Sequence, residues 1–177
     1  MQLQEHVQLM AEYNQCMNQK IYDAAGKLSL EQLHQDRGAF FGSIFGTLNH
    51  IAVGDTTWLK RFFQALPTHA ELKPVDDLPW PESLDQILYT HLDQLRVRRS
   101  LLDKALSDLA AAITDDELLQ SVRYTSMKGD TFSKNLFGLL MHVFNHQTHH
   151  RGQVTTLLAQ LGVDYGTTDL VVLLPDM

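Results

Sequence analysis

Four of the nine histidines in the chain lie between residues 142 and 150. His146 and His150 are four residues apart, and residues with this spacing lie on the same face of an α-helix with Cβ atoms roughly 5–6 Å apart. Two imidazole nitrogens can therefore point at one cation. A third ligand from another part of the chain would complete a reactive site, because a metal with three protein ligands keeps a position for water or substrate.

The apolar positions of the same segment indicate which histidines face inward. Each residue advances about 100° around a helix, so His150 lies roughly 25° and His146 about 65° from the centre of the apolar stripe. His142 and His149 lie more than about 100° away. The inward pair is His146 and His150, although two histidines at the polar edge of an amphipathic helix would give the same pattern. The stripe comprises Leu136, Leu140, Val143, Val154, Leu158 and Leu161.

His50 is the candidate for a third ligand, in a second segment with helical spacing. On the helical wheel it lies almost opposite the main apolar stripe, so periodicity does not support an inward position. The residues around it are small, however, and small residues let another helix approach or leave an opening above the imidazole. On these grounds the role of His50 stays open. The stripe is Phe41, Phe45, Leu48, Ala52 and Leu59, and the small residues are Ser43, Gly46, Thr47, Gly54 and Thr57.

Four polar residues near these histidines are candidates for supporting roles around a metal. Asn49 and Asn145 each precede a histidine and could hydrogen-bond a loop, orient an imidazole, or simply cap polar surface. Asp55 lies on the apolar stripe beyond His50 and needs a partner if it is buried. We expect that partner to be Arg151, which could instead pair with an anionic substrate.

Helix packing around the site gives two further expectations. Trp58, Phe62 and Tyr124 could line a pocket for an apolar substrate, although core packing is the simpler role for them. Gly152 costs roughly 1 kcal/mol of helix propensity relative to alanine, which indicates that a neighbouring helix comes close to it.

Composition and charge restrict the class of protein. With 177 residues, 44% of them hydrophobic, residues 1–177 should form one domain with its own core. The net charge of −7 argues against nucleic acid as a partner, and we expect the basic run at residues 96–99 (RVRR) to be a solvated helix face. No apolar run has the length of a signal peptide or a membrane span, and the single cysteine, Cys16, fits a reducing compartment. We therefore expect a cytoplasmic protein without a membrane partner.

Four long segments have helical periodicity. The first begins near residue 3 and ends near Gly26, the second runs from about residue 39 to about 65, the third begins around Pro81 and reaches about residue 113, and the fourth carries the histidine cluster. Prolines punctuate a long connection between the second and third. Shorter features are capping boxes at residues 29–32 and 114–117, a turn between extended pieces at 122–131, and an apolar tail at 170–174 that should pack on the helices or on a second subunit. This pattern predicts an all-α fold, a four-helix bundle with one long crossover connection, which can build metal sites from facing helices.

The residues also resemble a known family. Residues 37–43 (RGAFFGS), 47–51 (TLNHI), 55–62 (DTTWLKRF) and 145–153 (NHQTHHRGQ) look like the DinB family of DNA-damage-inducible proteins, within the DinB/YfiT-like superfamily and distinct from the DNA polymerase of that name. The resemblance spans nearly the whole chain, with further matches at Tyr13-Asn14, Gly162 and residues 168–170. It implies one divalent metal ion, typically nickel or zinc with iron and manganese as alternatives, held by His50, His146 and His150.

What the resemblance implies about activity is less specific. Relatives in the superfamily include enzymes that use low-molecular-weight thiols, so the chain is expected to activate a thiol or water for transfer to, or hydrolysis of, a small substrate. The alternative is a non-catalytic stress-response protein in which the ion is structural. The resemblance also suggests a homodimer, although no apolar stripe in the sequence requires one.

Overall fold

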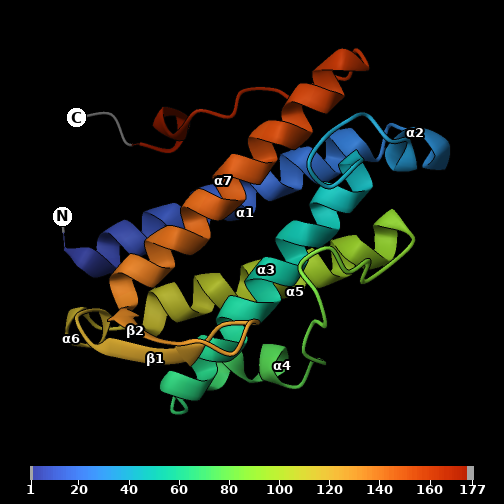
Figure 1. The fold of residues 1–177 in the computed structure, drawn as a ribbon. Helices are drawn as coiled ribbons and strands as arrows, with labels where there is room; N and C mark the ends of the chain where they lie inside the picture. The colour runs from blue at the N-terminus through green and yellow to red at the C-terminus, as the bar shows by residue number, and fades with distance from the viewer. Residues whose placement is uncertain (1, 175–177) are drawn as a thin grey trace.

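A computed structural model describes residues 2–174, and most of these residues lie in helices (Figure 1). The predicted domain also includes residues 1 and 175–177, which lie outside the described residues. The α-helices of the described part are α1 (Leu3–Ala25), α2 (Leu30–His34), α3 (Ile44–Ala65), α4 (Lys73–Asp76), α5 (Leu92–Ala112), α6 (Asp115–Leu118) and α7 (Leu136–Gln160). Two 3-10 helices, η1 (Ala70–Leu72) and η2 (Leu170–Leu173), and two strands, β1 (Ser121–Thr125) and β2 (Thr131–Asn135), complete it.

The four long helices correspond to the four periodic segments of the sequence. Helix α1 packs against α5 and α7, and α3 packs against the same two helices (Figure 1). Large apolar side chains from all four fill one hydrophobic core, which is what amphipathic stripes require. The core includes Met17, Phe45, Phe62, Leu102 and Phe144. Within residues 2–174, no helix is both long enough and apolar enough to cross a bilayer.

Several local predictions are confirmed. Helix α1 stops at Gly26, whose N–H donates to the carbonyl of Tyr22. Both capping boxes form, at the starts of α2 and α6. The extended pieces around the Lys128-Gly129 turn pair as an antiparallel hairpin, with Val122 opposite Lys134 and Gly129 at φ +90°. The all-α prediction therefore describes most of the chain but omits this small sheet.

Helix α3 begins later than predicted, at Ile44 rather than near residue 39. Gly38 and Gly42 have φ values of +72° and +73°, in a region incompatible with a continuous α-helix. The helix starts where the Ser43 hydroxyl accepts the N–H of Gly46 at 3.0 Å. Phe41 consequently lies outside the helix and does not belong to its apolar stripe.

Helix α5 also begins later than predicted, at Leu92 rather than Pro81. The backbone N–H groups of Leu88 and Tyr89 donate to the Asn49 side chain of α3, at 2.8 and 3.3 Å, instead of to helical carbonyls. The segment between α4 and α5 is therefore held in an irregular conformation by α3. Its backbone groups find tertiary partners where periodicity alone predicted a helix.

The basic run at residues 96–99 is not the solvated face that was expected. Arg98 and Arg99 are buried, whereas Val97 is 71% exposed. Arg99 forms ion pairs with Asp55 at 2.5 Å and with Asp103 at 3.0 Å. The predicted pairing of Asp55 with Arg151 is therefore wrong, because a residue of α5 takes that place.

Arg151 joins the same buried network through Gln147, the residue after His146. The Gln147 amide donates to Asp55 at 2.7 Å, and its oxygen accepts from Arg151 at 3.1 Å. Asn18 of α1 donates both to Gln147 and to Asp103, at 3.0 and 2.8 Å. Side chains of α1, α3, α5 and α7 thus meet in one polar network, which fixes the rotation of α7 next to its histidines.

The C-terminal segment runs back along α1. Tyr13 and Lys20 of α1 donate to the carbonyls of Thr168 and Thr167, both at 2.7 Å. The apolar residues that follow are less covered, since Val171 is 66% and Val172 51% exposed. Of the predicted tail at residues 170–174, only Leu170 and Leu173 are half-buried, so its packing on the helices is partial, and packing on a second subunit stays a prediction.

Candidate metal site

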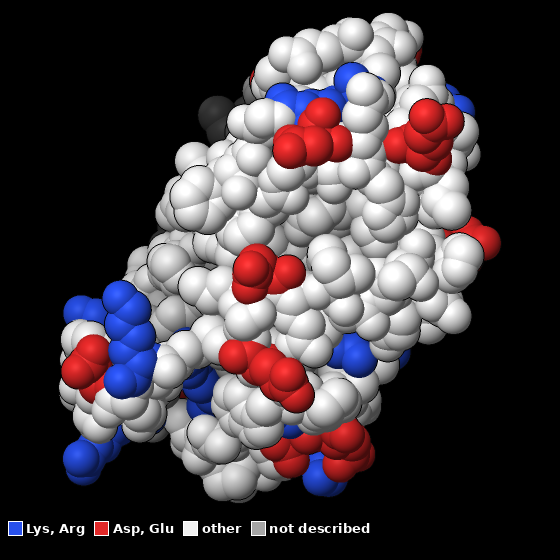
Figure 2. Space-filling model, turned by 45° about the vertical axis from the view of Figure 1, so that its right-hand side comes forward, with Lys and Arg blue, Asp and Glu red and all other residues white. Residues whose placement is uncertain are grey.

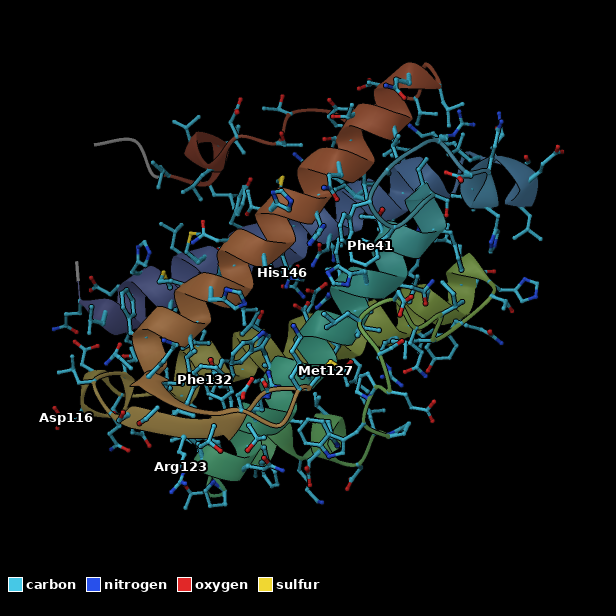
Figure 3. The ribbon with its side chains drawn as sticks, viewed as in Figure 1. Phe41, Asp116, Arg123, Met127, Phe132 and His146 are labelled. Atoms are coloured by element: carbon cyan, nitrogen blue, oxygen red, sulfur yellow. The ribbon has the colours of Figure 1, made fainter. Side chains whose placement is uncertain are left out.

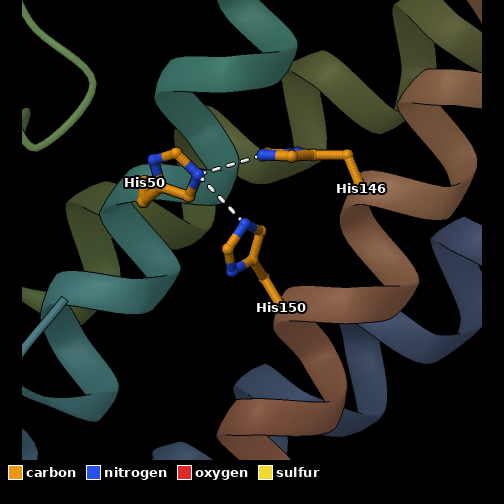
Figure 4. A group of neighbouring side chains, drawn as sticks. All are labelled: His50, His146 and His150. Atoms are coloured by element: carbon orange, nitrogen blue, oxygen red, sulfur yellow. Dashed lines mark hydrogen bonds between the residues drawn. The ribbon is translucent and has the colours of Figure 1, made fainter. Parts of the chain in front are cut away.

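Helices α3 and α7 bring together the three histidines that the sequence singled out. The Nε2 atom of His50 lies 3.0 Å from Nε2 of His146 and 3.2 Å from Nε2 of His150 (Figure 4). His50 and His150 are buried and His146 is half-buried. The unfavourable position of His50 on the helical wheel has a simple explanation, because α3 is buried on almost every side and one of its faces packs against α7.

Hydrogen bonds at the opposite nitrogen fix the orientation of two of these rings. Nδ1 of His50 donates to the carbonyl oxygen of Leu84 at 2.7 Å, and Nδ1 of His150 donates to Oε1 of Gln153 at 2.9 Å. A neutral imidazole carries one proton, so Nε2 of both rings presents a lone pair. Two lone pairs 3.2 Å apart repel each other unless a cation lies between them.

The two nitrogen separations from His50 fit a metal ion, and the ligand atoms of all three histidines lie within 4.8 Å of one another. Two nitrogen ligands at about 2.0–2.1 Å from one ion, with an angle of roughly 90–109° between them, are about 2.9–3.4 Å apart. The observed Nε2 separations from His50 fall in this range. Among residues 2–174 no carboxylate or thiol joins the group, so three imidazoles are the donor set. Such a set suits zinc, nickel, copper or iron better than magnesium or calcium.

The surroundings keep these imidazoles neutral. Burial and, to a smaller extent, the neighbouring imidazoles of His150 and His50 together lower the pKa of His146 to about 3. Burial also lowers the pKa values of His50 and His150. Metal binding requires the unprotonated ring, so the site is prepared for a cation at neutral pH.

Two residues of the N-terminal half shape the space around the rings. The ring of Phe41 stacks on His50, with centroids 3.7 Å apart and planes inclined by 18°. Gly54 lies beneath His146, and a Cβ atom at this position would be only 2.9 Å from Cε1 of that ring. The close approach of α3 and α7 therefore occurs at Gly54. It does not occur at Gly152, around which the structure leaves open space, so the prediction made for Gly152 is wrong.

The two asparagines that precede ligand candidates differ in role. Asn49 is buried and holds the segment before α5, whose Leu84 carbonyl orients His50. Asn145 is exposed and donates only to the carbonyl of Met141 in its own helix. Asn49 therefore fixes a loop by hydrogen bonds, whereas Asn145 belongs to the polar surface.

A cavity of about 760 Å³ lies next to the histidine cluster. Its wall is formed by α3, α7, the β1–β2 hairpin and residues 82–84, and it includes His50 and His146. Figure 3 shows Met127 and Phe132 on the hairpin to one side of His146, with Phe41 on the other side. The remaining wall residues are Gly54, Thr57, Trp58, Arg61, Glu82, Ser83, Leu84, Tyr124, Ser126, Lys128, Asp130 and His142.

The lining of the cavity shows the roles of the aromatic residues and of His142. For the three aromatic residues, the sequence left pocket lining and core packing open. Trp58 and Tyr124 line the cavity, whereas Phe62 is buried in the core. His142 lines it as well, although periodicity assigned this residue to the outer face of α7. Its position one turn before His146 is the signal that could have identified it, because residues four apart share a face.

The charge on the surface is dispersed. On the face shown in Figure 2, most of the surface is uncharged, and the Lys and Arg side chains lie in small groups interspersed with acidic ones. A nucleic-acid-binding face would concentrate basic side chains. The absence of a nucleic-acid partner stays a prediction, in agreement with this face.

Fold and site together define a mostly helical protein in which three histidines from two helices could hold a metal ion. The model of the DinB family matches residues 1–175, and the chain therefore belongs to the DinB family. The resemblance noted in the sequence is thereby confirmed.

Individual relatives agree with this assignment. The chain is 28% identical over 163 residues to Protein DinB of Bacillus subtilis strain 168, with 89% of this chain and 87% of that protein covered. A solved DinB-like protein from Bacillus cereus is similar in structure, with a TM-score of 0.53 and 22% sequence identity over 88% of this chain and 91% of the other. At this identity the second comparison supports the fold alone.

Proposed function

We propose that this DinB-family chain is a metal-dependent enzyme. In this proposal His50, His146 and His150 hold one divalent cation, zinc or nickel first and iron or manganese as alternatives. The cation activates a low-molecular-weight thiol or water for transfer to, or hydrolysis of, a small substrate, since a bound cation lowers the pKa of such a group. The observation that carries the proposal is the convergence of the three imidazoles beside a cavity of about 760 Å³ that His50 and His146 line.

Two features favour catalysis over a purely structural ion. Structural zinc sites are normally closed by four protein ligands, whereas the donor set among residues 2–174 has three. The cavity also reaches the rings of His50 and His146, so a substrate can approach the site. The alternative, a non-catalytic ion that only ties α3 to α7, requires neither feature.

The arrangement of the helices belongs to the same proposal. We infer that α1, α3, α5 and α7 act as one four-helix bundle, with residues 66–91 as the long crossover between α3 and α5. The pairwise packing of these four helices supports this inference. In such a bundle the ligands come from facing helices, as α3 and α7 do here.

The first test measures metal and activity together. Protein purified from its host is analysed for bound metal and assayed with panels of thiols and electrophiles, and a His150→Ala variant is compared with His91→Ala. His91 is an exposed histidine at the start of α5 and serves as a matched control. We expect the His150 variant to lose stoichiometric metal and activity and the His91 variant to keep both. Full activity of His150→Ala would exclude catalysis at this site.

A second measurement separates the enzyme from the structural alternative. Protein loaded with manganese is examined by water-proton relaxation, which detects water that exchanges rapidly at the ion. An open coordination position predicts enhanced relaxation, because at least one ligand is solvent. A closed ion without exchangeable water would favour the structural role.

A further inference from the structure

The cavity extends from the histidine cluster along one face of α3. His50, Gly54, Trp58 and Arg61 all line it and follow each other at intervals of four, four and three residues. This spacing places them on one side of the helix, and the eleven steps from His50 to Arg61 span about 16 Å at 1.5 Å per residue. A ligand that occupies the whole cavity is therefore elongated.

Arg61 lies at the end of the cavity away from the histidine cluster, and most of its N–H donors form no hydrogen bond within residues 2–174. Its guanidinium carbon lies 4.8 Å from the Trp58 ring and 5.1 Å from the Tyr124 ring. Of the hydrogen bonds formed by residues 2–174, it makes one, from Nη2 to the carbonyl of Thr125 at 2.8 Å. A guanidinium has five N–H donors, and no carboxylate of the described chain forms an ion pair with this one. The two rings hold a cation whose charge has no ion-pair partner among residues 2–174.

The wall between the two ends is predominantly apolar. Trp58, Leu84, Tyr124, Met127 and Phe132 supply aromatic and aliphatic surface. The other charged residues of the cavity, Glu82, Lys128 and Asp130, are exposed to solvent, and Lys128 and Asp130 lie on the hairpin turn. Their interactions with a ligand are screened more strongly than those of the half-buried Arg61.

We propose that the cavity binds an amphipathic carboxylate. The guanidinium of Arg61 holds the carboxylate group, the apolar body lies against Trp58, Tyr124 and Phe132, and the opposite end of the molecule reaches the histidine cluster. Arginine is suited to this role because its planar fork matches the two oxygens of a carboxylate. This substrate class rests on the proposed function, because a metal held by the histidine cluster would act on the end of the molecule opposite the carboxylate.

The test uses a matched pair of probes, 6-phenylhexanoate and 6-phenylhexanamide, titrated calorimetrically into the full chain. The pair differs in charge but hardly in shape. Titrations are performed after removal of metal by a chelator and again after loading with zinc, because a carboxylate could also bind an ion directly. In the metal-free protein we expect the acid to bind about ten-fold or more tightly than the amide, as for a charge-assisted hydrogen bond.

Three variants locate the preference. Arg61→Gln should reduce binding of the acid to that of the amide, whereas Arg61→Lys, which keeps the charge without the fork, should retain part of the difference. Lys104→Gln makes the same change of charge on α5, where Lys104 is exposed and, within residues 2–174, pairs only with Asp108. This control should leave both affinities unchanged. Circular dichroism of each variant confirms that the fold is intact.

The outcomes distinguish this proposal from the proposed function. Equal binding of the two probes to metal-free wild type, or loss of the preference in Lys128→Gln but not in Arg61→Gln, would overturn the assignment to Arg61. A preference that exists only with zinc and survives Arg61→Gln would also overturn it, while metal binding would stand. Conversely, a chain that takes up no metal but keeps the Arg61-dependent preference would refute the metal enzyme and leave the carboxylate site.

Discussion

Because Gly54 has no side chain, the ring of His146 can lie directly against α3. An added Cβ would meet Cε1 of that ring at 2.9 Å, so the ring has to move away from the position where the three Nε2 atoms converge. Ligand orientation strongly affects affinity for metals. The glycine therefore matters to the site through space and not through backbone conformation.

Gly54→Ala should weaken zinc binding by about ten-fold or more without weakening the fold through helix propensity, because alanine is favoured over glycine by about 1 kcal/mol in a helix. Gly152→Ala is the matched control on α7, where the new methyl group meets open space. It should leave zinc affinity unchanged and raise the free energy of unfolding by up to about 1 kcal/mol. Competition titrations with a chromophoric chelator measure the affinities. Unchanged zinc affinity in Gly54→Ala would show that the His146 ring can avoid the new methyl group and still bind the ion.

Asn49 acts on His50 through the segment that it anchors. Asn49→Ala removes the acceptor for the N–H groups of Leu88 and Tyr89 and should release the Leu84 carbonyl from the His50 ring. We expect zinc affinity to fall about 10- to 100-fold, as for loss of an outer hydrogen-bond partner of a metal ligand. Asn145→Ala, on the polar surface before His146, should have no such effect. Equal losses in the two variants would contradict this assignment.

The packing of α3 against α5 and α7 depends on buried charged and polar side chains, which hydrophobic periodicity does not predict. Asp55 of α3 contacts Arg99 of α5 and Gln147 of α7, and all three are almost fully buried. Removal of one partner from a buried pair leaves an uncompensated charge. This network therefore holds α3 and α7 at the separation that the histidine cluster needs.

Asp55→Ala should lower the free energy of unfolding by about 3–5 kcal/mol, the range observed when a buried ion pair loses one partner. Asp23→Ala provides the control, because Asp23 pairs with Arg96 at the surface and such pairs contribute about 1 kcal/mol or less. Urea denaturation of the two variants measures the difference. A loss in Asp55→Ala no larger than in the control would show that Arg99 is satisfied by Asp103 alone.

The connection between α3 and α5 contains a buried ionisable group with a predictable effect on stability. His69 contacts Glu71 at 2.6 Å and Glu117, at the start of α6, at 3.1 Å. Burial lowers its pKa, but the two carboxylates outweigh burial and hold the pKa above the ordinary value of 6.5. The protonated ring is therefore stabilised by the fold. This contribution is complete below the unfolded-state pKa and disappears as pH rises through the folded-state pKa.

Wild type and His69→Gln should accordingly differ most in acid. The difference in their free energies of unfolding is expected to be larger at about pH 5.5 than at about pH 9, conditions on either side of histidine titration. Urea denaturation at both pH values measures it, and the comparison with the variant at equal pH removes the contribution of all other groups. A difference independent of pH would mean that His69 is neutral throughout.

Local sequence signals predicted the elements better than their exact ends. Capping boxes and the hairpin turn depend on neighbouring residues, so Ser29, Thr114 and Gly129 could be interpreted from the sequence alone. The starts of α3 and α5 depend on glycine conformations and on the distant side chain of Asn49, which periodicity does not contain. Similarly, a single apolar stripe cannot place His50 on α3, because that helix is surrounded by other elements and buries two faces.

At the scale of the whole molecule, the candidate site joins two helices that are distant in sequence. An ion bound to His50 of α3 and His146 of α7 would bind the folded chain and not the unfolded one, and so would stabilise the fold. The buried polar network around Asp55 and the apolar core already hold these helices together without an ion. The expected stabilisation is therefore an addition to a folded protein.

Zinc at a free concentration of 100 times its dissociation constant should stabilise the chain by about 2.7 kcal/mol, which raises the melting temperature by roughly 5–11 °C for a domain of this size. Differential scanning calorimetry with zinc and with a chelator measures the shift. His150→Ala should abolish it, and the exposed His91→Ala should preserve it. An equal shift in all three proteins would place the ion elsewhere.

The order of the ligands along the chain has a consequence for biosynthesis. His50 leaves the ribosome 96 residues before His146, so a growing chain that has reached only α5 offers a single imidazole of the three. The proposed three-histidine chelate could form only after α7 has docked on α3. In the proposed metal enzyme, selection among cellular metals would thus be postponed until the protein has its final shape, when geometry as well as availability can decide which ion enters.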